Sequence, residues 1–319
     1  MDFSLRIPPF GLQKRESRWD YLEPLQKAAM ALELTWAALS GLLFIFIVFK
    51  LFRIRVESTP RGPYILLALV SFTFALGDAL NAVQLREDID VFDWFKVISA
   101  SSIFRAFSQV FVYAVLLWLT HIRGQAFGGS RPGSSSPIVA RTWKRVVDWV
   151  LVAVTFIYIV ALNAYSTTKN LSHIRRIYNN DYSSAEHDDY EEFVKISQKL
   201  QHVSTALSLL LAIDVVASLF VLWFAQRRAK FTDSVVTRLL ITSAPFVPPL
   251  TAMWLFYDIW VAKGIQSILK ANLAYVIIEG VCQIGIFASV VSTIDLHTDN
   301  DPSGSSSYLN QASNPAYKA

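Results

Sequence analysis

The sequence predicts an all-α, polytopic membrane protein: a bundle of seven transmembrane helices with an outer or lumenal N-terminus and a cytoplasmic C-terminus. Seven apolar stretches each reach the length of about 20 residues that a helix needs to cross a bilayer. Only 17% of the 319 residues are charged, against about 25% in soluble domains, and the mean hydropathy is +0.38. The 22 Phe and 9 Trp suit lipid-facing helices with aromatic belts at both interfaces.

Taken in chain order, the apolar stretches predict spans at about residues 28–50, 63–85, 97–120, 146–165, 200–225, 236–259 and 271–294. The first contains the uninterrupted apolar run 41–49. The sixth contains Pro245, Pro248 and Pro249. Proline removes a backbone donor and clashes with the preceding turn, so this span should be kinked or partly unwound. A structural kink and a functional hinge are equally compatible with the pattern.

The chain therefore divides into three parts: a polar segment 1–27, a seven-helix domain 28–297 and a cytoplasmic tail 298–319. The tail is rich in Ser and Asn and is expected to be disordered, and the loop 128–137, rich in Gly, Ser and Pro, is expected to be flexible. The first 27 residues lack the apolar core of a secretory signal. No internal repeat is visible, which weighs slightly against transporters built from inverted repeats.

The orientation follows from loop charge, because Lys and Arg accumulate in short cytoplasmic loops. Basic residues gather in the first, third and fifth loops, whereas the second and fourth loops are net acidic. The second and fourth loops, and with them the N-terminus, are therefore predicted to be outside or lumenal. The sequon at Asn170 lies in the fourth loop and marks the predicted glycosylation site. The expected location is the endoplasmic reticulum or the plasma membrane.

Polar residues inside the spans are concentrated at one depth, in the outer half of the membrane, if each residue rises about 1.5 Å. They are Glu33, Asp78, Asn81, Arg105, Gln109, Glu279 and Gln283. Residues four apart share a helix face, so each of the pairs Arg105/Gln109 and Glu279/Gln283 should turn one face into the bundle. Charges in hydrocarbon normally face a partner or a water-filled cavity. The sequence thus predicts a polar cavity that opens outward.

The charges of this layer do not balance, since three acids accompany one arginine. We expect Asp78 to pair with Arg105, which would leave Glu33 and Glu279 without a cation and favour a neutral carboxyl group. A neutral carboxylic acid in an apolar pocket is suited to act as a general acid. A purely structural clamp between Asp78 and Arg105 fits the pattern equally well.

Three further acids lie elsewhere in the spans. Asp214 is deeper, near the middle of the fifth span, where it could bind an ion or proton or bond to nearby hydroxyl groups. Asp148 and Asp258 are at span edges and are expected at the interface.

Several kinds of site are not indicated. The five His residues have no paired spacing, and the single cysteine, Cys282, excludes an internal disulfide, so we expect no metal and no cofactor. The net charge of +4 comes from loops and does not indicate nucleic-acid binding. The seventh span holds no lysine for a retinal Schiff base. The expected partners are the lipid bilayer and a hydrophobic small molecule.

The chain resembles the small seven-helix membrane terpene cyclases of fungal secondary-metabolite pathways in its length scale, its helix count and its intramembrane acids Asp78, Asp214 and Glu279. The resemblance implies an enzyme that protonates an olefin or epoxide of a prenylated intermediate, with these three acids as catalytic residues. Aromatic faces would stabilise the cations. The expected binding residues are Arg105, Gln109, Gln283, Glu33 and Asn81.

Two other functions fit the same pattern. A seven-helix receptor would use the outward-facing cavity as its ligand pocket, although the missing disulfide and the missing receptor signatures argue against it. A lipid- or proton-coupled transporter would use Asp214 and the proline-rich sixth span as moving parts. We favour the enzyme over both.

Overall fold

The computed structural model describes residues 24–53, 61–84, 91–129, 137–178, 184–229, 233–261 and 265–299. These residues form helices and connecting turns with no strand among them, which confirms the all-α prediction. The predicted tail beyond Asp299, most of the polar N-terminal segment and most of the loop 128–137 lie outside the described residues. The side chain of Asp258 lies outside them as well.

The described helices are α1 (Pro24–Arg53), α2 (Gly62–Gln84), α3 (Val91–Gly129), η2 (Ile138–Ala140), α4 (Thr142–Tyr178), α5 (Ser184–Arg228), α6 (Ser234–Thr242), η3 (Ala244–Phe246), α7 (Val247–Val261) and α8 (Ile265–Asp299). Within the described residues, seven helical segments are long and apolar enough to cross a membrane. Each overlaps one predicted span. The chain is accordingly a multi-pass membrane protein.

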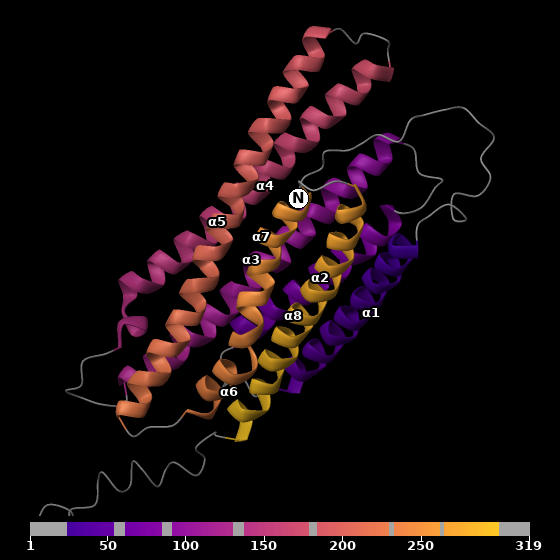
Figure 1. The fold of residues 1–319 in the computed structure, drawn as a ribbon. Helices are drawn as coiled ribbons and strands as arrows, with labels where there is room; N and C mark the ends of the chain where they lie inside the picture. Colours follow the sequence, from indigo (N-terminus) through magenta and orange to yellow (C-terminus); the bar gives the residue numbers. More distant parts are fainter. Residues whose placement is uncertain are drawn as a thin grey trace, which may run out of the picture.

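Two helices are much longer than the apolar stretches that predict them. The fourth and fifth spans are predicted at 146–165 and 200–225, but α4 has 37 residues and α5 has 45. Figure 1 shows α4 and α5 rising together past the ends of the other helices. A hydropathy pattern does not predict the polar ends of these helices, because it detects only the apolar part that crosses the bilayer.

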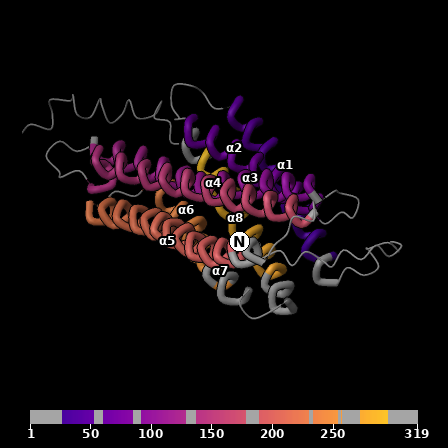
Figure 2. Tube along the Cα trace, turned by 90° about the horizontal axis from the view of Figure 1, so that it is seen from above, coloured from indigo at the N-terminus to yellow at the C-terminus, as the bar shows by residue number. Residues whose placement is uncertain are grey.

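The helices close into a ring: from α1 to α6 each helix packs on the next, α7 packs on α8, and α8 returns to pack on α1. Viewed from above, α3 and α8 lie between α1 and α2 on one side and α5 and α7 on the other (Figure 2). The apolar window of α3 is 72% buried and that of α8 is 61% buried, against 17% for α1. The two central helices can therefore carry polar side chains away from lipid.

The sixth span is interrupted, as the prolines predict. Helix α6 ends at Thr242, a short 3₁₀ segment holds Pro245, and α7 then begins at Val247. Pro248 and Pro249 lie in the first turn of α7, where a backbone N–H has no partner within the helix and proline is tolerated. The break packs on α8, where Ser243 and Ser289 hydroxyl groups are 2.5 Å apart.

Candidate functional site

Four charged side chains from four helices meet in the interior of the bundle. Arg105 of α3 places Nη2 2.6 Å from Glu33 Oε2 of α1 and 2.9 Å from Asp78 Oδ1 of α2. Its Nη1 is 3.6 Å from Glu279 Oε2 of α8. Each of these side chains is at most 7% exposed. We call Glu33, Asp78, Arg105 and Glu279 the carboxylate–arginine centre.

The pairing of Asp78 with Arg105 is confirmed, but the expectation that the other acids lack a cation is wrong. Glu33 makes the shortest contact with the guanidinium, and Glu279 lies at its other edge. One planar guanidinium presents donors in several directions, so a single arginine reaches all three acids. Sequence spacing could not reveal this, because the three acids come from three different helices.

Glu279 differs from the other two acids in its neighbours. It accepts a hydrogen bond of 2.8 Å from the Gln109 amide and also meets the hydroxyl of Tyr275. Gln109 donates to the Tyr275 hydroxyl as well, at 3.2 Å. Glu279 is thus held mainly by neutral donors, whereas Glu33 and Asp78 are held mainly by the guanidinium. Tyr275 is not among the predicted site residues, although it lies one turn from Glu279 on the same face.

Small and polar residues of α2 and α3 hold Arg105 in place. A Cβ atom at Gly77 would come within 3.0 Å of Arg105 Cγ, so glycine makes room for the arginine stem. Ser101 donates to the Gly77 carbonyl at 2.9 Å and fixes the two helices there. The Asn81 amide oxygen, turned toward Arg105, lies 2.8–2.9 Å from its guanidinium nitrogens. Asn81 therefore lies in the same polar layer as the four charged residues, where its position in the second span predicts it.

The three acids and one arginine leave the centre with an excess of negative charge when all are ionised. Burying an unbalanced charge in a low-dielectric interior is strongly unfavourable. The centre therefore has to hold at least one proton, or another cation, to be stable as described. Glu279, which the guanidinium contacts least closely, is the carboxyl group best placed to carry a proton.

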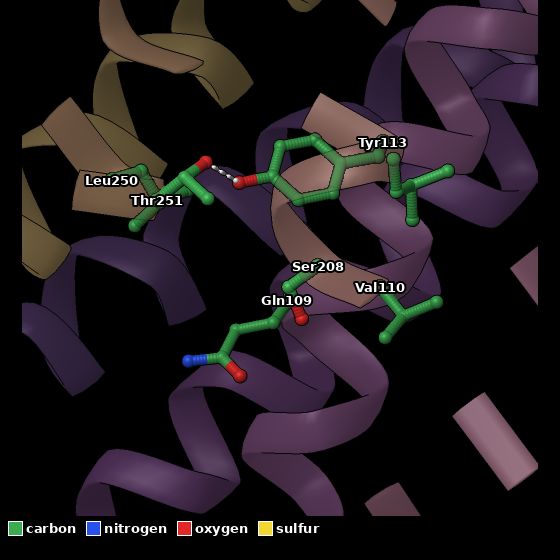
Figure 3. Close-up of a pocket in the computed structure, with 7 residues that line it drawn as sticks. Gln109, Val110, Tyr113, Ser208, Leu250 and Thr251 are labelled. Atoms are coloured by element: carbon green, nitrogen blue, oxygen red, sulfur yellow. Dashed lines mark hydrogen bonds between the residues drawn. The ribbon is translucent and has the colours of Figure 1, made fainter. Parts of the chain in front are cut away.

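A small cavity lies next to the centre, between α3, α5 and α7. It is lined by Gln109, Val110, Tyr113, Ser208, Leu211, Leu250 and Thr251, and its volume is about 10 Å³. Figure 3 shows the Tyr113 hydroxyl directed at Thr251, at 3.1 Å, with the Gln109 amide below them. That volume is near the minimum for a single water molecule. Gln109 connects the two features, since it lines the cavity and donates to Glu279.

The remaining predicted residues lie apart from the centre or lack partners. Gln283 is fully buried on α8, and neither atom of its amide has a hydrogen-bond partner among the described residues. Asp214 is in a different cluster, where Lys144 of α4 binds it at 2.5 Å and also binds Asp148. Asp148, predicted at the edge of the fourth span, is buried within the protein, with its side chain 2% exposed.

The predicted glycosylation site is also in an unexpected environment. Asn170 lies inside α4 rather than in a loop, is 6% exposed and accepts a 3.0 Å hydrogen bond from the Tyr190 hydroxyl of α5. A glycan is attached to the amide nitrogen and needs that nitrogen to be accessible, whereas this side chain is buried. The burial therefore argues against modification of Asn170 in the folded protein.

No protein family, no curated protein and no solved structure matches this chain at a significant level. The functional interpretation consequently depends on the geometry of the site and on its chemistry.

Proposed function

We propose that this protein is a proton-coupled membrane transporter of a hydrophobic small molecule. The observation that carries the proposal is the carboxylate–arginine centre, in which three buried acids share one guanidinium. Three carboxylates and one guanidinium leave two negative charges, so two protons neutralise the centre, and each proton is held in the interior of the bundle, away from water. Its release changes the net charge of a buried site, and such a change favours a different helix arrangement.

The small volume of the cavity beside the centre favours a transporter over an enzyme that encloses its substrate there. Pockets that enclose drug-sized ligands have volumes of about 300–1,000 Å³, whereas this cavity measures about 10 Å³. The cavity that the described residues line beside the centre therefore has no room for such a ligand. A transporter passes through such a state when it alternates between its two sides.

The interrupted sixth span supplies a moving element for such a cycle. The break between α6 and α7 leaves backbone groups without the regular helical ladder, and it packs on α8, which carries Glu279. Thr251 of α7 bonds to Tyr113 at the cavity. A change at Glu279 can thus reach the broken helix through α8 and through the cavity wall.

The proposal is tested by measuring the export of prenylated and lipidic compounds from a host that makes them and expresses this protein. Cells expressing wild type, Glu279→Gln or the control Glu191→Gln, at matched protein levels, are compared by mass spectrometry of cells and medium. Glu191 is an exposed glutamate paired with Lys195. We expect wild type and the control to shift at least one compound into the medium, and Glu279→Gln or a protonophore to abolish the shift. Identical distributions in all three strains contradict transport.

The second candidate is the membrane terpene cyclase, and the burial of Glu279 favours it. Its side chain is 2% exposed and lies 3.6 Å from the guanidinium, and burial without a close cation favours the neutral acid that can protonate an olefin or epoxide. The aromatic rings of Tyr275 and Tyr113 lie nearby. The same extracts separate the two candidates. A new cyclised isomer that disappears in Glu279→Gln supports the enzyme.

The proposal retains the orientation from the loop charges, with the N-terminus outside or lumenal and the C-terminus cytoplasmic. The carboxylate–arginine centre is then in the outer half of the bilayer, in the endoplasmic reticulum or the plasma membrane. Protons would enter the centre from that side.

A further inference from the structure

A second buried ionic cluster joins three helices and a connecting segment. It comprises His121 of α3, Lys144 and Asp148 of α4, and Asp214 of α5. The cluster lies toward the end of the bundle at which α3 leads through η2 into α4. We call these four residues the histidine–aspartate cluster.

The helical repeat separates this cluster from the carboxylate–arginine centre. The 16 residues from Arg105 to His121 correspond to a rise of about 24 Å and a rotation of about 160°. Arg105 therefore faces α1, α2 and α8, while His121 faces α4 and α5. Arg123, two residues further, is on another side of α3 and pairs with Asp233 at 3.8 Å.

Both ring nitrogens of His121 face an oxygen. Nδ1 is 3.0 Å from the Val139 carbonyl of η2, and Nε2 is 2.9 Å from Asp148 Oδ2. A neutral imidazole carries a single N–H and can donate to only one of them. Among the described residues, neither Nε2 nor Asp148 Oδ2 has a hydrogen-bond partner of regular geometry, so their 2.9 Å contact is a close approach of two polar atoms. One additional proton between His121 and Asp148 turns this second contact from two facing acceptors into an attractive pair.

The charges of the cluster also call for one additional proton. Lys144 contributes one positive charge, and Asp148 and Asp214 contribute two negative charges. With one extra proton the cluster is neutral, and without it the cluster carries an unbalanced charge. His121 is 3% exposed and Asp148 is 2% exposed, so this charge would be buried.

We propose that His121 and Asp148 form a second proton-binding site, separate from the carboxylate–arginine centre, and that the bound proton holds η2 and the start of α4 against α3. Uptake converts the imidazole to an imidazolium, with N–H groups directed at Val139 and Asp148. Loss of the proton removes one of these two contacts. Asp214 and Lys144, which are 23% and 15% exposed, supply a route by which the proton exchanges with the surroundings.

The inference stands without the proposed transport, because it concerns proton occupancy and local order. The first measurement is ¹⁵N NMR of protein labelled at histidine, in lipid nanodiscs, over a pH series. The chain has only five His residues, and His121→Gln identifies the signal of interest. We expect His121 to hold both ring protons in wild type and to lose one in Asp148→Asn at the same pH. A His121 signal that is insensitive to Asp148→Asn overturns the site.

The second measurement is amide hydrogen exchange of residues 138–141, which include η2. We expect exchange to accelerate at least about tenfold in His121→Gln, because a charge-assisted hydrogen bond is lost. The control is His173→Gln, which removes a histidine stacked on Tyr190 at the far end of α4. Exchange that is unchanged in His121→Gln, or equally fast in the control, overturns the holding role.

Discussion

Arg105 decides whether the carboxylate–arginine centre can be buried, because its guanidinium is the cation that contacts all three acids. Removing one partner of a buried ionic network leaves uncompensated charge and costs about 3–5 kcal/mol. We expect Arg105→Met to lower the free energy of unfolding by that amount, measured by chemical denaturation in lipid nanodiscs. Adding Glu33→Gln and Asp78→Asn to this variant should recover most of the loss, because the charges left behind are then removed.

The exposed pair of Lys96 and Asp93 provides the control for this prediction. These side chains are 71% and 61% exposed, and their contact of 2.7 Å is as short as those of the buried centre. An exposed ion pair contributes at most about 1 kcal/mol, so Lys96→Met should be close to neutral. Equal losses in Lys96→Met and Arg105→Met would show that burial does not set the role of Arg105.

At the scale of elements, α1 and α8 approach each other closely at one glycine of α8. A Cβ atom at Gly280 would come within 2.3–2.4 Å of the Trp36 indole, so Trp36 rests on the backbone of α8. Gly41 lies on α1, where an added Cβ atom would meet nothing within 4 Å. The same substitution at the two sites therefore separates helix packing from helix propensity.

We expect Gly280→Ala to be less stable than Gly41→Ala by about 1–3 kcal/mol, the usual loss when a well-packed contact is overfilled. Thermal unfolding in nanodiscs measures the difference. Trp36→Leu in the Gly280→Ala background should recover part of the stability, because the smaller side chain makes room for the methyl group. Two alanine variants of equal stability would mean that α8 does not approach α1 this closely.

The sequence predicts the helices only over the stretches that are apolar or interrupted by proline. The apolar runs identify all seven spans, and the prolines at 245, 248 and 249 identify the break in the sixth. The polar ends of α4 and α5 escape this kind of prediction, because a helix that leaves the bilayer no longer needs apolar residues. Lys144 falls in a predicted loop for the same reason, since it precedes the apolar run of its span.

At the scale of the whole molecule, the sequence predicts the depth of a polar side chain along its span better than it predicts which side chains are in contact. The rise per residue places Glu33, Asp78, Arg105 and Glu279 in one layer, and the structure brings these four together. Depth does not say which faces meet, however. The histidine–aspartate cluster is not predictable in this way, because His121 lies just past the end of its apolar run and its partners come from helices that only the folded ring brings together.

The two ionic clusters lie about 24 Å apart along α3, and this separation makes their coupling measurable. Effects on stability add for sites so distant, within about 0.3–0.5 kcal/mol, so Glu279→Gln and Asp148→Asn should lower the free energy of unfolding independently. Transport should behave differently. If both proton sites act in one cycle, either substitution alone stops the cycle. The double variant should then export as much as the less active of the two single variants. Losses of export that multiply would show that the two sites work separately.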